Sequence, residues 1–388
     1  MKSGDGFVAE APADRHWQAD VPIQTKWRGI VTFVEGPDGQ NVDGYKLDEI
    51  LRFGFFHVHA PVFEHLFVKS QILALCIFVG VLALFLVIMD GYELMTIDPA
   101  LVSSSAEVFN YFSGLSAFIF GFFVFAQLGS FLSIKNDMVG GFWGAFQDLS
   151  SLTGAWLPGT DTKTKAIKET IVRWGLASFA LMCGEANPEV PDAKTNVERA
   201  VQRSLLTKQE AAQVLEAGGN PAVPLIWMLD IYETSLHGKP GADFKVNKAE
   251  DKILLMRSGV GNTLTAVSSY GLLPLPLVHL MSALVKLQLF LLALKEGIFV
   301  ADVIVGDSVS KTLQISFALL MTVATPLVFQ SLLEFVIMIS NPFGNDWIDF
   351  PTLLWHKQIR DEVLDLVKVG EFAANLPTVK AAKAIPSA

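Results

Sequence analysis

The stretch "QILALCIFVGVLALFLVIM", residues 71–89, decides the fold class of this protein. It carries no charged side chain, and Asp90 follows it directly. A helix needs about 20 apolar residues to cross the hydrocarbon core of a bilayer. We therefore interpret 71–89 as a transmembrane helix.

The composition of the whole chain agrees with a membrane protein. Of its 388 residues, 51% are hydrophobic and only 18% are charged, below the usual soluble level of about 25%. Three further apolar stretches have membrane-spanning length, at 109–132, 272–294 and 312–339. We predict an all-α membrane protein with four transmembrane helices and a helical domain on the cytosol-like side.

The distribution of Lys and Arg predicts the orientation. Segments 1–70 and 135–271 hold seven and fourteen of them, whereas the connections 90–108 and 295–311 hold none and two. An even number of spans places both termini and the middle segment on the same basic side. The net charge of −10 argues against a nucleic-acid partner.

The sequence pattern of segment 135–271 predicts helices and not a loop. Charged and apolar residues alternate at helical spacing from Thr164 to Cys183. Thr207 and Glu210 form a capping-box pattern, closed by a glycine pair. We expect an apolar helix at 221–236 and a polar linker at 237–251.

These patterns predict a division of the chain into six segments. The N-terminal segment is 1–45, and an interfacial helix with spans one and two follows at 46–134. The extramembrane helical domain is 135–271, and spans three and four are 272–340. The acidic turn with its following helix is 341–367, and the tail is 368–388.

No catalytic motif is present in the sequence, and we do not expect an enzyme. Cys76 and Cys183 lie in apolar surroundings and are interpreted as free thiols. The glycines of "SGVGNT", 258–263, do not match a nucleotide-binding fingerprint. His57, His59, His65 and Glu64 could bind a metal, but an interfacial segment before span one explains them better.

Large apolar residues line one face of the second span. Leu115, Phe118, Phe122 and Phe125 are spaced at i, i+3, i+7 and i+10. This face could contact lipid or a protein core. It could also line a pore if several subunits surround one axis, since hydrophobic constrictions can gate by dewetting.

Ionisable residues interrupt the third and fourth spans. His279 and Lys286 share a helical face, and Glu334 lies in span four. Such residues at membrane depth normally face a protein interior or water and have a partner. We expect a Lys286–Glu334 contact, which serves either structural pairing or permeation.

An acidic turn follows the fourth span at "NPFGNDWIDF", residues 341–350. Asp346 and Asp349 place two carboxylates beside a tight turn with free backbone carbonyls. Carboxylate and carbonyl oxygens are the ligands of calcium. The same residues could instead form a solvated turn with aspartate as a helix cap.

The turn and the phenylalanine stretch together resemble one family. "NPFG" followed by D-x-x-D-F, and "FIFGFFV" at 118–124, are similar to two motifs of the bestrophins. "RW" at 173–174, "LLTKQE" at 205–210 and "VPLIW" at 223–227 occur in the family's order. The resemblance implies a homopentameric, largely helical anion channel with an axial pore, often gated by calcium.

Carried over by position, the resemblance assigns Phe118 and Phe122 to the neck of the pore. The family's third neck position falls on Gly114, where a larger apolar residue is usual, and Leu115 could substitute for it. Just after the neck, Ser130 and Phe131 replace the family's usual Arg-Trp pair.

The resemblance also assigns a calcium clasp to the end of span four. Asp346 and Asp349 match its two carboxylates, while Met338 and Asn341 match the positions that supply backbone carbonyls. The family's run of acids is shortened here, since Asn345, Trp347 and Ile348 occupy positions that are usually acidic.

The resemblance thus implies a pentamer that conducts chloride, bicarbonate or other monovalent anions and contacts lipid and copies of itself, with calcium as gating ion. Two alternatives stay open. One is a non-conducting membrane scaffold or a subunit of a larger assembly, and the other is a proton-coupled transporter using His279, Lys286 and Glu334. The plasma membrane and the chloroplast or thylakoid membrane are both possible locations.

Overall fold

The computed structural model describes residues 66–375, with gaps at 158, 160, 191, 240, 271–274, 307–309, 341 and 345–348, and the backbone of 24–28, 31–36 and 39–45. The chain divides into two compact units. The first comprises Met1–Lys46, Phe131–Tyr270 and Asn341–Ala388, and is called the helical domain below; the second comprises Leu47–Ser130 and Gly271–Ser340, and is called the apolar unit.

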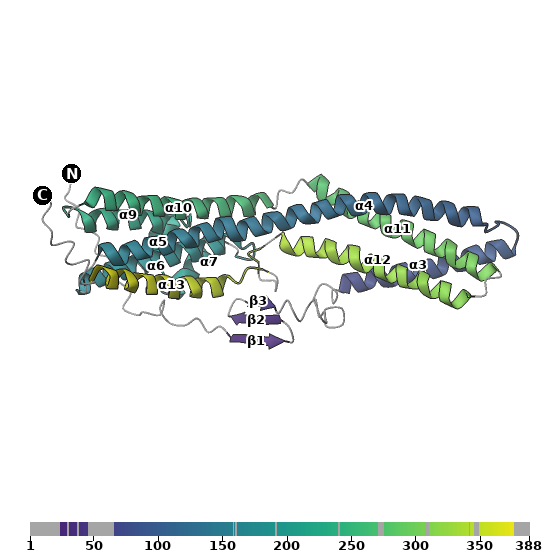
Figure 1. Cartoon of the computed structure of the whole chain (residues 1–388), viewed down its shortest axis with the longest axis horizontal. Helices are drawn as coiled ribbons and strands as arrows, with labels where there is room; N and C mark the ends of the chain where they lie inside the picture. The colour runs from purple at the N-terminus through teal and green to yellow at the C-terminus, as the bar shows by residue number, and fades with distance from the viewer. Residues whose placement is uncertain are drawn as a thin grey trace. The chain divides into compact units, whose positions relative to one another are not determined.

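Long helices form the apolar unit (Figure 1). They are α3 (Leu66–Gly91), α4 (Pro99–Ser133), α11 (Leu275–Val305) and α12 (Lys311–Ile339). The start of α4 is specified locally: Asp98 accepts a hydrogen bond from the backbone N–H of Leu101 at 2.8 Å, and Pro99 occupies the first helical position.

Apolar side chains hold these helices together in two clusters. One joins α4, α11 and α12 through Phe120, Phe123, Met281, Val285, Leu289, Leu333 and Val336. The other joins α3, α11 and α12 through Ala83, Leu86, Val300, Ala301 and Ala318, together with Ile97. At Gly297 a Cβ atom would collide with Leu82, so this glycine sets the close approach of α11 to α3.

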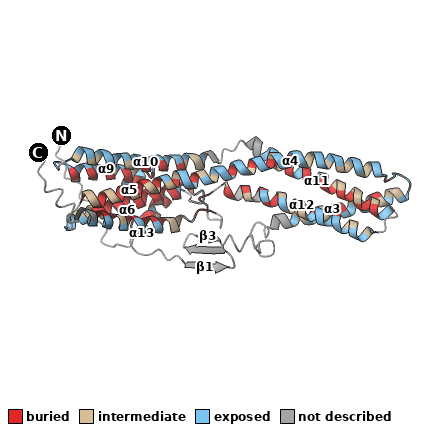
Figure 2. Ribbon diagram, viewed as in Figure 1, coloured by how far each residue is buried: buried red, intermediate tan, exposed pale blue. Residues whose placement is uncertain are grey.

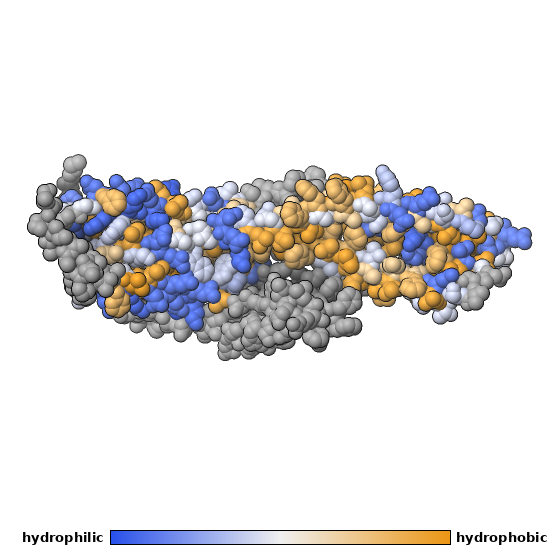
Figure 3. Space-filling view, in the orientation of Figure 1, coloured by the Kyte–Doolittle hydropathy of each residue, from blue (hydrophilic) through white to orange (hydrophobic). Residues whose placement is uncertain are grey.

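Much of the apolar surface of these helices faces outward (Figures 2 and 3). On the face shown in Figure 3, hydrophobic side chains gather over α4 and α12. Three stretches are long and apolar enough to cross a membrane, Ser70–Gly91, Pro99–Trp156 and Lys311–Leu333. The predicted span 272–294 falls largely in α11, which is not one of these three, so the count of four spans stays a prediction.

The helical domain contains α5 (Gly140–Trp156), α6 (Thr162–Ala186), α7 (Ala193–Gln202), α8 (Lys208–Glu216), α9 (Val223–Leu236), α10 (Ala242–Tyr270) and α13 (Thr352–Asn375). Helix α6 is central, because it contacts α5, α7, α9, α10 and α13. Its segment 170–179 is buried throughout. The predicted capping box is confirmed: Thr207 and Glu210 exchange both hydrogen bonds at the start of α8.

The chain passes from one unit to the other within helical backbone. Helix α4 continues into a π-helical turn, η2 (Ile134–Val139), and then into α5. The N–H of Gly140 bonds to the carbonyl of Lys135, five residues earlier. Such π-helical turns are rare and often mark functional positions in helices.

The structure corrects three expectations. The predicted linker 237–251 is wrong beyond residue 241, because α10 begins at Ala242 and apolar Phe244, Val246 and Ala249 alternate with its charges. The predicted tail boundary at 368 is wrong as well, since α13 continues to Asn375.

The third correction concerns the all-α class. Three antiparallel strands precede the helices: β1 (Gln24–Arg28), β2 (Val31–Gly36) and β3 (Gly39–Tyr45), in the order β1-β2-β3. Valine, threonine and aromatic residues in 25–34 favour strands, and "GPDG" at 36–39 is a turn signal. The helical class therefore holds for the described part from residue 66 onward.

Candidate functional site

The phenylalanine face of α4 points away from the core of its unit. Phe118, Phe122 and Phe125 are 76%, 71% and 74% exposed, and Leu115 is exposed on the same face. On the opposite face, Ser116, Phe120, Phe123 and Gln127 are buried. The helix therefore uses one row of phenylalanines for its own core and presents a second row outward.

Gly114 lies at the edge of this outward face. A Cβ atom at this position would meet nothing within 4 Å, so packing within the chain does not require a glycine here. Its effect is to remove side-chain volume beside Leu115. If the face lines a passage, the passage is wider at Gly114 than at the phenylalanines.

From Leu115 to Phe125 the outward face is apolar and carries no formal charge. From Pro99 to Ser133, the sequence of α4 contains a single charged side chain, Glu107, which lies about three helical turns before Phe118. Phenyl rings have positive edges and negative faces. An ion beside this face would interact with ring edges and not with a countercharge.

The acidic turn is closed at its base by backbone hydrogen bonds. The N–H of Phe350 donates to the carbonyl of Pro342 at 2.8 Å, and the N–H of Thr352 donates to the carbonyl of Phe350 at 2.7 Å. Asp349 is 2% exposed. The turn thus holds one carboxylate in the interior of the helical domain, directly before α13.

Aromatic side chains anchor this turn. The rings of Phe343 and Phe350 meet edge to face at 5.3 Å, and Trp355 of α13 lies 4.9 Å from Phe350. Phe131, in the last turn of α4, lies 4.7 Å from Phe350. The turn is therefore packed against the last turn of α4, the part of this helix that belongs to the helical domain.

The predicted calcium ligands are described only in part. Met338 lies in the last turn of α12, where its carbonyl has no i+4 donor because Pro342 lacks an N–H. Asn341 and Asp346 lie outside the described residues. Asp349 supplies a buried carboxylate, which is a hard oxygen donor of the kind that calcium prefers.

The described residues show no contact among the ionisable residues of the predicted third and fourth spans. His279 and Lys286 are both exposed on α11. The side chain of Glu334 lies outside the described residues, so the Lys286–Glu334 contact stays a prediction. The histidine cluster at 57–65 also lies outside them. Cys76 and Cys183 are free thiols, as predicted.

Sequence reasoning missed the residues that hold the site in place. Phe343, Phe350, Phe131 and Trp355 come from three separated segments, so no local spacing reveals their contact. Arg199 on α7 and Arg203, the residue that caps its C-terminal end, can be recognised in the sequence as a pair four residues apart. What they face becomes apparent only in the folded domain.

Comparison with protein families gives a match over most of the chain. A family model described as "Bestrophin, RFP-TM, chloride channel" matches residues 58–361. Bestrophin homolog 22 of Caenorhabditis elegans is 27% identical over 208 residues, which are 51% of this chain and 40% of that protein. Bestrophin homolog 5 of the same organism is 22% identical over 268 residues, 68% of this chain and 56% of that protein. The matched region spans about half the length of these relatives.

Solved structures show the same fold. A mutant of a bacterial bestrophin homologue from Klebsiella pneumoniae has a TM-score of 0.59 at 16% identity, covering 78% of this chain and 99% of that chain. A second structure of that homologue, phased with zinc, has a TM-score of 0.58 at 16% identity, covering 77% and 98%.

Proposed function

The chain belongs to the bestrophin family, and we propose that it forms an anion channel whose neck is lined by the outward face of α4. The observation that supports this most is the pair of opposite phenylalanine rows on that helix. Phe120 and Phe123 complete the core of the subunit, whereas Phe118 and Phe122 are left outward without a role in that core.

In the proposed assembly, five copies surround one axis and each contributes Phe118 and Phe122. Rings of phenylalanine exclude bulk water, and such hydrophobic constrictions gate by dewetting. Phenyl edges tolerate an anion better than a cation. The neck would therefore select against cations without a charged residue, and chloride and bicarbonate are the anions it would pass.

We further propose that the acidic turn regulates this neck. Asp349, Asp346 and the backbone carbonyls of Met338 and Asn341 would hold calcium, which supplies positive charge to balance the two carboxylates. Phe350, next to Asp349, contacts Phe131 in the last turn of α4. Phe131 lies six residues from Phe125, which is a helical rise of about 9 Å. Packing at the acidic turn would therefore bias the position of the phenylalanine face of α4.

The neck assignment is tested with Phe118→Ala and Phe122→Ala in proteoliposomes. Removing either ring widens the constriction and lowers its dewetting barrier. We expect anion flux to rise by about tenfold, the effect of lowering a barrier by about 1.4 kcal/mol. Flux of chloride and of bicarbonate is measured with a fluorescent anion indicator and in single-channel recordings.

Phe317→Ala on α12 is the matched control, because Phe317 is also an exposed phenylalanine of an apolar helix. It should leave flux unchanged. Equal flux in wild type, Phe118→Ala and Phe122→Ala would refute the neck assignment. Absence of flux in all variants would favour a scaffold, whereas saturating, proton-coupled flux would favour a transporter.

A further inference from the structure

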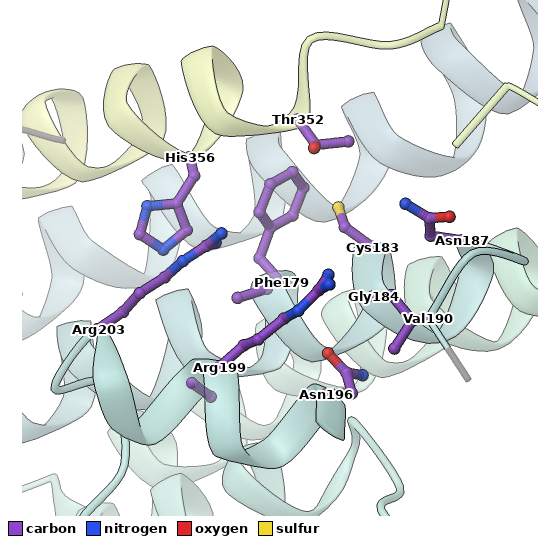
Figure 4. Close-up of a pocket in the computed structure, with 12 residues that line it drawn as sticks. Phe179, Cys183, Gly184, Asn187, Val190, Asn196, Arg199, Arg203, Thr352 and His356 are labelled. Carbon is purple, nitrogen blue, oxygen red and sulfur yellow. The ribbon is translucent and has the colours of Figure 1, made fainter. Parts of the chain in front are cut away.

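The helical domain contains a small cavity and a larger groove. The cavity has a volume of about 60 Å³ and lies between α6, α7 and α13, with Arg199 and Arg203 at the end of α7 and His356 on α13 among its lining residues (Figure 4). The groove has a volume of about 450 Å³ and lies between the end of α6, the connection from α8 to α9, and the second half of α10. This volume is in the range of sites that bind small organic molecules.

Two opposite charges line the groove without pairing with each other. Glu185 comes from the end of α6 and Arg257 from α10, and both side chains are exposed. Neither side chain has an ion pair or hydrogen bond within the described part of the chain, whereas Lys252 on α10 pairs with Asp148 at 2.6 Å. The groove therefore offers one carboxylate and one guanidinium that a ligand can reach.

The carboxylate of Glu185 would gain from a bound cation. Its position in the groove removes part of its water, which raises the pKa of Glu185. An ammonium group beside it would lower that pKa again, because opposite charge favours the ionised form.

The wall formed by the connection from α8 to α9 is held in one conformation. The glycines at 218–219 have φ angles of 76° and 82°, a region that glycine adopts without strain. The side chain of Asn220 accepts a hydrogen bond from the N–H of Ala222 at 2.9 Å. The buried hydroxyl of Ser178 on α6 donates to the carbonyl of Pro221 at 2.7 Å. This wall of the groove is therefore preformed.

A glycine of α10 leaves space in the groove. The stretch "SGVGNT", 258–263, contains two glycines with different surroundings. A Cβ atom at Gly259 would lie 3.1 Å from the Cβ of Phe142, so this glycine allows α10 to pack against α5. A Cβ atom at Gly261 would meet nothing within 4 Å, and Gly261 lines the groove. A large side chain at position 261 would therefore occupy the space that glycine leaves open.

We propose that the groove binds an amino acid as a zwitterion, with its ammonium group on Glu185 and its carboxylate on Arg257. A guanidinium matches a carboxylate with two parallel hydrogen bonds, and an ammonium group can donate three. Val260 is buried and Leu264 is half-buried in the same lining, so an apolar side chain of the ligand has an apolar surface to contact. A molecule with only one of the two charges makes only one of the two ion pairs.

The proposal is tested by isothermal titration calorimetry on the purified full chain in detergent, at neutral pH and fixed ionic strength. Leucine carries both charges and an apolar side chain. Leucinamide carries only the ammonium group, and isocaproate carries only the carboxylate. We expect saturable binding of leucine, and binding of each single-charge analogue that is at least about tenfold weaker.

Variants assign each end of the ligand to its partner. Glu185→Gln should bind leucine and isocaproate equally, and Arg257→Gln should bind leucine and leucinamide equally, because each variant removes the partner of one charge. Gly261→Leu should abolish binding while both charges remain. Asn262→Leu is the matched control and should bind as wild type does, since Asn262 is the next residue of α10 and is exposed outside the groove lining.

The proposal is overturned if leucine gives no saturable heat, if either single-charge analogue binds wild type as tightly as leucine does, or if Gly261→Leu binds as wild type does. Glu185 and Arg257 are exposed, so their variants keep the test decisive even where Gly261→Leu destabilises α10. Binding is measured without flux, so its outcome is independent of the proposed channel activity.

Discussion

At the scale of the residue, one buried pair of opposite charges in the helical domain lies in a compact hydrogen-bond network. Arg173 and Glu210 form two hydrogen bonds at 2.7 Å, and both residues are almost completely buried. Glu210 also accepts hydrogen bonds from the Trp174 indole and from the backbone N–H of Thr207, both at 2.7 Å. One carboxylate thus fixes α6 to α8 and caps α8 as well.

Glu210→Gln should destabilise the domain by about 3–5 kcal/mol, because it leaves the Arg173 charge buried without its counterion. Burial alone raises the pKa of Glu210, but the hydrogen bonds and charge of Arg173 outweigh burial and lower it overall. The carboxylate therefore stabilises the fold above pH 4.5, its ordinary pKa, and this contribution is lost as the pH falls through the lowered pKa.

Thermal unfolding followed by circular dichroism across this pH range checks the prediction. The variant should show a flatter dependence on pH than wild type below pH 4.5. Glu216→Gln at the exposed end of α8 is the matched control. If Glu210→Gln and Glu216→Gln have the same unfolding midpoint, the network around Glu210 does not contribute the predicted free energy of unfolding.

At the scale of the element, glycines set the approach of α5 to α13. A Cβ atom at Gly154 would collide with the backbone of Val367 and Gly370, and one at Gly370 would collide with α5 in return. The two helices therefore touch backbone to backbone. This contact positions α13, which begins beside the acidic turn and carries Thr352 and His356 into the cavity.

Gly154→Ala should lower the stability of the domain by about 1–3 kcal/mol, the usual cost of overpacking a close contact. Gly144→Ala on the same helix is the matched control, since a Cβ there meets nothing within 4 Å. Alanine is the better helix former by about 1 kcal/mol, so this control should be neutral or stabilising. Thermal unfolding in detergent measures both; equal effects of the two variants would contradict the proposed contact.

At the scale of the whole molecule, the two units share one uninterrupted run of helical backbone. Helix α4 carries the phenylalanine face in the apolar unit and ends at Ser133, just after Phe131 contacts Phe350 in the helical domain. Within the helical domain, the acidic turn contacts the end of α4 through the rings of Phe350 and Phe131. The proposed calcium regulation depends on this contact as well as on the ligands.

Asp349→Ala should abolish the calcium dependence of anion flux, because it removes a buried carboxylate of the proposed calcium site. Phe131→Ala should retain calcium binding, measured by calorimetry, but weaken its effect on flux. Asp365→Ala on α13 is the control, since Asp365 is 74% exposed. Calcium dependence that survives in Asp349→Ala would contradict the assignment of the turn.

Much of the fold could be predicted from the sequence, because its signals are local. Long apolar runs specify α3, α4 and α12, and the capping box at Thr207 specifies the start of α8. The prediction of a linker at 237–251 is wrong beyond residue 241 because the charged residues there alternate with apolar ones. Of these, Val246 and Ala249 pack against other helices only in the folded domain. The strands before residue 46 were missed because the helical pattern that follows them dominates the composition.

The sequence by itself determined which stretches are apolar enough for a membrane, where several helices begin, and the family signature of the acidic turn. Only the tertiary structure decided which phenylalanines of α4 face outward, that Phe131 contacts Phe350, and that Arg199, Arg203 and His356 share a cavity. The physical reason is the range of the interactions. Helix formation and capping depend on neighbours within a turn, whereas these contacts join segments separated by more than a hundred residues and exist only after packing.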